Sequence, residues 1–161
     1  MHPMTTVTLR PMTPAEFDEW QEALAADYAA EQVAAGTWPA QGAVERARAE
    51  NARVLPQGVR TERMLFLRAH DADGEHVGRS WVALDHPRGA PGVAFLYDIE
   101  VVEPRRGQGL GRALLEATED AVRQAGATGL ELNVFGRNTA AVSLYGSAGY
   151  AVVTQQMRKA L

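Results

Sequence analysis

Arg106-Gly107-Gln108-Gly109-Leu110-Gly111 is the stretch of this sequence that decides the fold. It lies between a long apolar segment, residues 93–102, and residues 109–124, where apolar side chains recur at helical spacing. A strand, a glycine-rich turn and a helix start in this order form an anion site, because successive backbone N–H groups and the helix dipole point at one place. We therefore expect a phosphate-bearing ligand at this turn.

Three phosphate-binding patterns compete for the turn. A P-loop requires a lysine after its glycines, and none follows here. A dinucleotide-binding turn would need its last glycine at Arg112, or at Leu114 if the pattern began at Gly109. What remains is Arg-x-x-Gly-x-Gly, formed by Arg106, Gly109 and Gly111. On its own, this pattern also describes a tight turn with ordinary glycines at a helix start.

Helical and strand patterns predict the elements around the turn. Thr13-Pro14-Ala15-Glu16 offers an N-cap, a proline at the first helical position and a capping-box glutamate, and Gly36 ends that helix. The other predicted elements are a helix at 42–55, strands at 64–67 and 77–84 around a hairpin turn at 71–74, strands at 93–102 and 130–135, helices at 109–124 and 138–148, and a last strand beginning at 150–154. This order predicts one mixed α/β sheet.

The sequence around the turn resembles the GNAT superfamily of N-acetyltransferases. Arg106, Gly109 and Gly111 match its pyrophosphate-loop pattern. The resemblance continues in Leu96-Tyr97-Asp98-Ile99-Glu100-Val101-Val102, in Leu132-Asn133-Val134-Phe135-Gly136-Arg137-Asn138 and in Leu144-Tyr145-Gly146-Ser147-Ala148-Gly149-Tyr150. The whole chain is similar to small, mostly uncharacterised bacterial members that carry a Tyr-Asp-Ile-Glu-Val strand.

This resemblance implies the GNAT acyl-CoA N-acyltransferase fold. That fold is α/β, with a central mixed sheet of roughly six to seven strands, about four flanking helices and a splay between two central parallel strands. We expect a single domain over residues 1–161. Residues 5–62 would supply a strand and two helices on the acceptor side, and residues 63–161 the hairpin, the coenzyme-binding core and the C-terminal strands.

Acetyl-CoA is the acyl donor that the resemblance implies. The backbone amides expected to hold its pyrophosphate are those of Arg106, Gly107, Gln108, Gly109, Leu110 and Gly111, with the side chain of Arg106 or Arg112 adding charge. The pantetheine arm would lie in the splay along the free backbone of Glu100 to Val102, with the N–H of Val101 facing the thioester carbonyl. Asn138 is the family's usual coenzyme-contacting asparagine, and it is equally a plausible helix N-cap.

Two carboxylates break the apolar pattern of the strand before the turn. Strict alternation would place Phe95, Tyr97, Ile99 and Val101 on one face, and Leu96, Asp98, Glu100 and Val102 on the other. A central strand covered on both faces should be apolar throughout, and departures from such rules concentrate at functional sites. We expect Glu100 to act as general base, directly or through water, and Asp98 to orient it or to contact the acceptor ammonium. Alternatively, this face is open to solvent, or both acids pair with an arginine.

Tyr145 matches the family's tyrosine, and the resemblance implies that it protonates the coenzyme thiolate. The alternative is a core tyrosine with a satisfied hydroxyl. Asn133 stands where some relatives, including ribosomal-protein N-terminal acetylases, carry a glutamate base. An amide cannot take a proton, so either Glu100 serves or the acceptor arrives neutral, which counts against that substrate class.

The composition excludes several kinds of chemistry. The chain has 161 residues, no cysteine and a net charge of −4. Without cysteine it can form no disulfide, thiolate metal site or acyl-thioester intermediate, so acetyl transfer would be a direct attack in a ternary complex. The charge gives no reason to expect nucleic acid. His70, His76 and His86 do not have the spacing of a metal site, so no metal is expected.

The acceptor is indicated only by charge. The acidic residues between positions 11 and 45 are Glu16, Asp18, Glu19, Glu22, Asp27, Glu31 and Glu45, and this segment has no lysine or arginine. An acidic wall with aromatic side chains nearby would suit a cationic small-molecule or peptide amine. The alternative is a solvated helix face.

The cellular location and two alternative functions are also predicted from the sequence. Residues 1–5 lack a signal-peptide pattern, and no apolar run approaches the roughly 20 residues of a membrane span. We expect a cytoplasmic protein, monomeric or homodimeric, that contacts neither membrane nor nucleic acid. A non-catalytic acyl-CoA-binding or sensing domain and an interaction module whose glycine loop only turns the chain stay open. Glu100 and Tyr145 together argue against the sensor.

Overall fold

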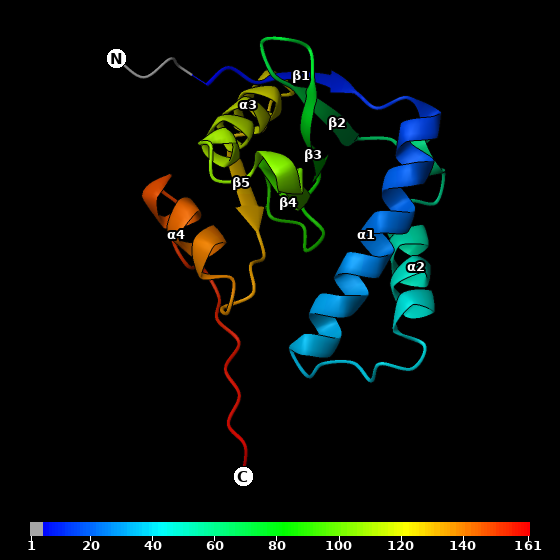
Figure 1. Cartoon of the computed structure of the whole chain (residues 1–161). Coiled ribbons are helices and arrows are strands. Elements are labelled where there is room, and N and C mark those ends of the chain that lie inside the picture. Colours follow the sequence, from blue (N-terminus) through cyan, green and yellow to red (C-terminus); the bar gives the residue numbers. More distant parts are fainter. Residues whose placement is uncertain (1–4) are drawn as a thin grey trace.

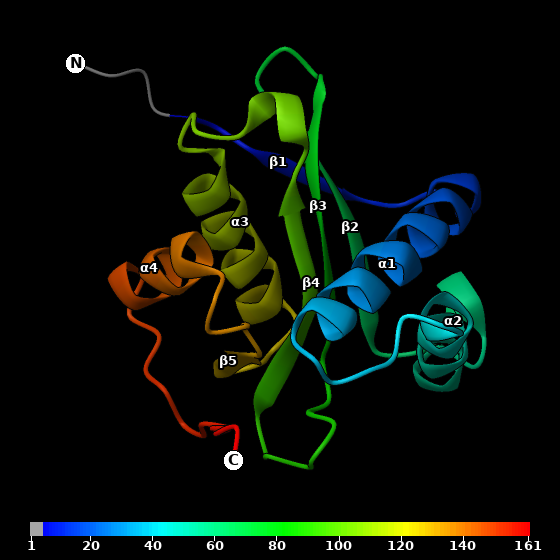
Figure 2. The same cartoon turned by 60° about the horizontal axis from the view of Figure 1, so that its bottom comes forward.

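A computed structural model describes residues 5–161 as a five-stranded sheet with helices on both faces (Figures 1 and 2). The strands follow one another in spatial order: β1 Thr8–Pro11, β2 Met64–His70, β3 His76–Ala83, β4 Val93–Val101 and β5 Gly129–Leu132. Neighbours are antiparallel except for β4 and β5, which are parallel. The mixed α/β prediction is confirmed, with fewer strands than expected. Residues 1–4, which include most of the stretch without a signal-peptide pattern, lie outside the described residues.

Four α-helices complete this part of the chain: α1 Pro14–Ala34, α2 Ala43–Val54, α3 Leu110–Gln124 and α4 Thr139–Ser147. Figure 2 shows the sheet edge-on, with α1 and α2 on one face and α3 and α4 on the other. The predicted capping box of α1 is present, because the Thr13 hydroxyl accepts from the Glu16 N–H and the Glu16 carboxylate accepts from the Thr13 N–H. No helix among residues 5–161 is long and apolar enough to cross a membrane.

A β-bulge in β4 decides which side chains meet which helices. Trp81 of β3 pairs with Asp98, but its neighbour Val82 pairs with Leu96, so Tyr97 is an extra residue in β4. The Tyr97 ring stacks on Trp81, with centroids 4.4 Å apart, in the core beneath α1. A bulge places two successive side chains on the same side of the strand and reverses the alternation beyond it.

The alternation predicted for β4 is therefore wrong beyond the bulge. Asp98 and Glu100 lie on the α1 face together with Tyr97. Ile99 and Val101 pack on the opposite face against Leu110 and Leu114 of α3. Leu96 also belongs to that opposite core and not to the face of Asp98. The acidic side chains thus face the helix that the sequence assigns to the acceptor side.

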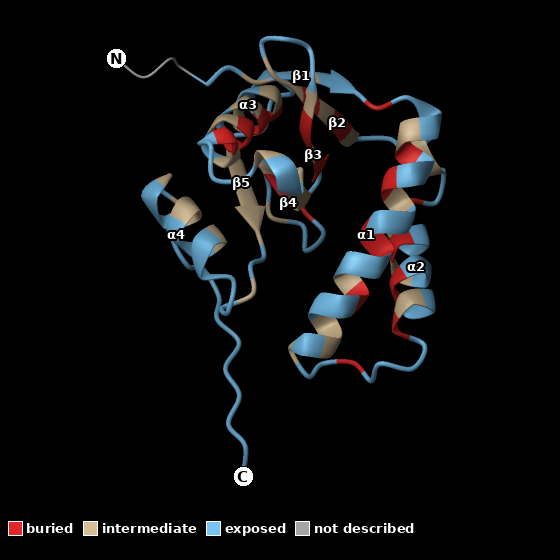
Figure 3. Cartoon of the chain, viewed as in Figure 1, coloured by how far each residue is buried: buried red, intermediate tan, exposed pale blue. Residues whose placement is uncertain are grey.

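The last strand predicted from residue 150 onward is not formed. Residues 151–161 belong to no helix or strand and are all exposed (Figure 3). The strand predicted to reach residue 135 also ends earlier, at Leu132. The sheet therefore ends at β5, whose outer edge has no strand beside it within residues 5–161 and whose pairing with β4 stops at Leu132.

Gly78 of β3 lies in close contact with the backbone of β4 at Glu100. A Cβ at this position would lie 2.5 Å from the Glu100 carbonyl oxygen and 3.0 Å from Leu114 Cδ2. We expect Gly78→Ala to lower the free energy of unfolding by about 1–3 kcal/mol in a urea titration followed by tryptophan fluorescence, because backbone cannot yield like a side chain.

The matched control is Gly146→Ala in α4, where a Cβ meets nothing within 4 Å. That change should leave stability unchanged or raise it by up to ~1 kcal/mol, since alanine favours helix over glycine. Equal stability of Gly78→Ala and the wild type would contradict the close β3–β4 contact.

Candidate active site

The parallel ladder between β4 and β5 is short. It runs from Val93 opposite Gly129 to Leu96 opposite Leu132 and stops at the bulge. Tyr97 is unpaired, and from Asp98 to Val101 β4 is paired only with β3. The backbone on the other side of β4 therefore has no β5 partner, which is the predicted splay between the two parallel strands.

Only part of the backbone expected to be free at this splay is free. The N–H of Val102 donates to the Val77 carbonyl oxygen at 2.9 Å, so it is turned toward β3 and cannot serve a coenzyme. Because successive residues of a strand point their backbone groups to opposite sides, Val101 faces away from β3. Its carbonyl oxygen accepts from Arg106 Nε at 3.1 Å.

The glycine turn presents a row of unused donors. Gly107 and Gly109 have φ values of 74° and 79°, and Gly109 directly precedes the first turn of α3. Between Gly107 and Arg112, no backbone N–H meets an acceptor among residues 5–161. The first N–H groups of a helix have no intrahelical partner, and here the preceding turn extends that row of free donors. The turn thus has the donor set that a phosphate group requires.

The arginine side chains around the glycine turn bind other residues of the protein and do not lie over the free N–H groups of the turn. Arg106 forms an ion pair with Glu100 at 2.8 Å, and Arg112 donates to the Ser147 hydroxyl at the end of α4. Arg105 forms an ion pair with Asp71 of the β2–β3 hairpin at 2.9 Å, and its Nε donates to the Gln108 side chain. Arg105 thereby fixes the turn to the sheet.

Both strand carboxylates bind one arginine. Arg79 of β3 donates from Nε to Asp98 at 2.8 Å and from Nη2 to Glu100 at 2.6 Å. Burial alone would lower the pKa of Arg79, but the charges of Asp98 and Glu100 and the hydrogen bond to Asp98 outweigh it and raise that pKa. Trp20 of α1 adds a hydrogen bond from Nε1 to Asp98 at 2.9 Å. The alternative in which both acids pair with an arginine is therefore what the structure shows.

Tyr145 has the environment of a proton donor. Burial, followed by the negative charge of Asp98, raises the pKa of its hydroxyl. That hydroxyl has no hydrogen-bond partner within the described part of the chain, whereas the neighbouring Tyr150 donates to Glu119 at 2.7 Å. The Tyr145 hydroxyl is thus available for a contact outside the described chain, and its role as general acid stays a prediction.

Asn138 has a structural role in addition to any contact with a ligand. Its side-chain oxygen accepts from the Ala141 N–H at 3.2 Å and caps α4. The cap uses only the oxygen, and the amide nitrogen has no partner among residues 5–161. A cap and a ligand contact are therefore compatible.

Two of the acidic residues of α1 belong electrostatically to this site. Burial raises the pKa of Glu31, the nearby Arg137 opposes that shift, and the charges of Asp27 and of both strand carboxylates add to it. Asp27 also lies 3.9 Å from Arg79. Glu16 and Glu22 of the same helix instead form ion pairs with Arg10 and Arg48, away from β4.

The sequence pattern did not single out Arg79 as a member of the site, and it did not predict the contact of Trp20 with Asp98. A signal for Arg79 existed, because it is the one charged residue in the apolar stretch from Val77 to Leu84. Trp20 is one of the aromatic side chains expected near the acidic wall, but its hydrogen bond to Asp98 was not predicted, since its spacing with Phe17 and Leu24 describes a core residue and it is one.

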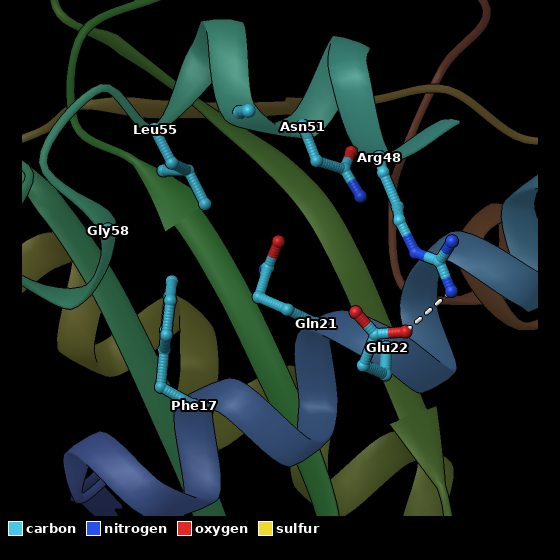
Figure 4. A pocket seen from close by; sticks show the side chains of 8 residues that line it. Phe17, Gln21, Glu22, Arg48, Asn51, Leu55 and Gly58 are labelled. Carbon is cyan, nitrogen blue, oxygen red and sulfur yellow. Dashed lines mark hydrogen bonds and ion pairs between the residues drawn. The ribbon is translucent and has the colours of Figure 1, made fainter. Parts of the chain in front are cut away.

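A separate hollow of about 260 Å³ lies between α1 and α2 (Figure 4). Phe17 and Leu55 line it, and the Glu22–Arg48 ion pair lies at its side. The side-chain nitrogens of Gln21 and Asn51 are buried there without partners among the described residues. The hollow holds no nucleophile, acid or base apart from that ion pair, so the splay and the turn are the better candidate site.

Comparison with known proteins agrees with this geometry. Residues 17–150 match the model of the acetyltransferase (GNAT) family. The chain belongs to the GNAT family of acetyltransferases. The uncharacterised N-acetyltransferase YdgE of Bacillus subtilis is 32% identical over 156 residues, which are 96% of this chain and 98% of YdgE.

Solved structures of GNAT proteins share the fold. The crystal structure of YycN from Bacillus subtilis covers 97% of this chain and 99% of its own, at 31% identity and a TM-score of 0.91. PaiA N-acetyltransferase of Thermoplasma acidophilum, solved with coenzyme A, covers 94% of this chain and 93% of its own, at 19% identity and a TM-score of 0.66. As a GNAT member the chain is an acyltransferase, and the family's acyl donor is acetyl-CoA.

Removing the shared arginine should destabilise the protein. The side chains of Arg79, Asp98 and Glu100 are only 18%, 13% and 31% exposed. We expect Arg79→Met to lower the free energy of unfolding by about 2–3 kcal/mol at neutral pH, because it leaves the mostly desolvated Asp98 without a counter-ion and Glu100 with Arg106 alone. Urea titration measures this loss.

Arg63→Met is the matched control for that variant. Arg63 also forms an ion pair, with Asp85 at 2.7 Å, but both side chains are more than half exposed. An exposed pair contributes about 0–1 kcal/mol. A similar small loss in both variants would show that the Arg79 pairs are not a structural requirement.

Proposed function

We propose that this chain transfers the acetyl group of acetyl-CoA to a primary amine by direct attack within a ternary complex. The observation that carries the proposal is the continuous row of unsatisfied N–H groups from Gly107 to Arg112, placed where β4 loses its β5 partner. A pyrophosphate needs several donors at one point, and the pantetheine arm needs an exposed strand backbone. The glycine turn supplies the free donors, and the end of β4 that precedes it supplies the exposed strand backbone.

In the proposed complex the coenzyme competes with Arg106 for the splay. The guanidinium of Arg106 now donates to the Val101 carbonyl and to Glu100. We infer that the pantetheine takes the Val101 backbone and that Arg106 turns to the phosphates, which would leave Glu100 with Arg79 alone. The N–H of Val101 would then face the thioester oxygen and stabilise the oxyanion.

The proposed chemistry uses the two groups on opposite sides of the splay. The amine nitrogen attacks the thioester carbon, the new C–N bond forms, and the C–S bond breaks as the tetrahedral intermediate collapses. Glu100 takes the proton that the attacking nitrogen loses, directly or through water. Tyr145 gives its proton to the departing thiolate, which its raised pKa keeps available at neutral pH.

A cationic amine is the acceptor class that the charges favour. Asp27 and Glu31 of α1 act on the same space as Asp98 and Glu100, and no lysine occurs in residues 11–45. Such a field attracts an ammonium group and concentrates it near the base. The second candidate function, an acyl-CoA sensor without turnover, would need neither Glu100 nor Tyr145 at this place.

Calorimetric titration with acetyl-CoA and release of free thiol with a panel of amines test the proposal together. We expect Tyr145→Phe and Glu100→Gln each to bind acetyl-CoA like the wild type and to lower kcat by about 10²–10⁴-fold, because each loses one proton-transfer group. Since the pKa of Tyr145 is raised, its loss should act equally at pH 6 and pH 9.

The matched control is Tyr150→Phe, which removes a nearby tyrosine hydroxyl already bound to Glu119. It should keep wild-type kcat. Absence of acetyl-CoA binding would contradict the proposal. Binding of acetyl-CoA without turnover of any amine would favour the sensor function.

The acceptor class has its own test in α1. We expect Glu31→Gln to raise KM for a diamine by about tenfold relative to the wild type while kcat changes little, because a long-range charge affects binding more than proton transfer. Glu19→Gln, the same change at another exposed position of the same helix, should leave KM unchanged. Equal KM values for both variants would show that the acidic residues of α1 are only a solvated face.

A further inference from the structure

The hollow between α1 and α2 takes no part in the proposed reaction, because none of its lining residues lies at the splay or in the glycine turn. Its volume is about 260 Å³, whereas a cavity of roughly 150 Å³ already holds a benzene molecule. Phe17 and Leu55, each only 6% exposed, supply its apolar walls. The hollow is therefore large enough for a small organic molecule with an apolar body.

Two polar side chains of this hollow have unused donors. Asn51 of α2 is 9% exposed, and its side-chain nitrogen is buried without an acceptor among residues 5–161. The same is true of the side-chain nitrogen of Gln21 in α1. Figure 4 shows both side chains extending from their helices into the space between α1 and α2. Because a buried donor without an acceptor destabilises a protein, this pair of amides favours a ligand with acceptor oxygens.

The charge beside these amides selects among ligands that carry acceptor oxygens. Arg48 lines the hollow, and its side chain is 50% exposed, so its guanidinium lies on the solvent side of the buried walls. Arg48 Nη2 donates to Glu22 at 2.8 Å. A guanidinium has several further N–H groups, so Arg48 can hold a ligand carboxylate while Glu22 stays paired. The cation and the two amides together therefore favour an anionic oxygen group.

We propose that this hollow binds a small carboxylate with an apolar body. The carboxylate oxygens accept from the side-chain amides of Asn51 and Gln21 and from the guanidinium of Arg48. The apolar body packs between Phe17 and Leu55. A cationic or purely apolar ligand would leave both amide donors unpaired, so it fits the hollow less well. The inference is independent of the proposed acetyl transfer.

Phenylacetate is the probe for the first test. It joins a benzene ring to one carboxylate, and it has no amine that could serve as an acetyl acceptor. Calorimetric titration of the full chain should give saturable binding at one site per chain. Phenylacetamide keeps the ring and a carbonyl oxygen but has no charge, and it should bind about tenfold more weakly or worse. Absence of saturable phenylacetate binding, or equal affinity for the two probes, would overturn the proposal.

A variant that fills the hollow shows where the probe binds. Ala52 of α2 lines the hollow and is exposed, so Ala52→Phe should occupy the hollow without changing the core. We expect it to abolish phenylacetate binding and to leave the urea unfolding midpoint unchanged. Ala49→Phe, the same change at an exposed position of α2 outside the hollow, should bind phenylacetate like the wild type. Wild-type binding by Ala52→Phe would overturn the proposal, since the probe would then bind elsewhere.

Two further variants test the polar contacts. Asn51→Leu should weaken phenylacetate binding by about tenfold without lowering stability, because it removes a buried donor that has no acceptor within the described chain. Arg48→Gln should weaken phenylacetate by about tenfold and phenylacetamide little. Arg53→Gln, at an exposed position of α2 outside the hollow, should change neither affinity. Wild-type phenylacetate affinity in both Asn51→Leu and Arg48→Gln would overturn the proposed contacts.

Discussion

The extra residue in β4 is the constraint on which the rest of the site depends. Tyr97 has no partner of its own in β3, and its ring is held against Trp81 in the core beneath α1. Because the bulge reverses the alternation, Asp98 and Glu100 face α1, while Ile99 and Val101 close the core beneath α3. The same bulge bends β4 at the point where its ladder with β5 stops. The inserted Tyr97 thus places Asp98 and Glu100 on the face of α1, and it lies where the β4 backbone loses its β5 partner.

Electrostatics then decide how those acids are held. Arg79 lies opposite Glu100 in the β3–β4 register and reaches Asp98 as well, so a single guanidinium fixes both carboxylates. Its two hydrogen bonds use different nitrogens of one planar guanidinium. Both carboxylates are therefore held in fixed orientations, which the point charge of a lysine ammonium would not achieve. Glu100 also contacts Arg106, which is more than half exposed and belongs to the glycine turn. Glu100 therefore connects a rigid cation in the sheet with a movable one at the proposed phosphate site.

Much of this arrangement could be predicted from the sequence, because the signals were local. The capping box at Thr13, the hairpin turn after His70 and the glycines before α3 each specify their own few residues. The positions of Glu100 and Tyr145 followed from resemblance together with the strand pattern. The bulge could not be predicted, since nothing in the residues around Tyr97 distinguishes it from regular alternation. The ion pairs of Arg79 and the hydrogen bond of Trp20 to Asp98 could not be predicted either, because they exist only once distant segments lie side by side.

The shortness of β5 connects the site with the outer edge of the sheet. A strand of four residues leaves β4 open toward the glycine turn, as a coenzyme needs, but it gives the sheet a weak last member. α4, which carries Tyr145 and has no buried residue, packs beside this strand and against α3 through Leu144. Tyr145 is held by packing against the core that contains Leu96 and Leu115, so the short β5 leaves open the gap that the proposed reaction requires without releasing this side chain.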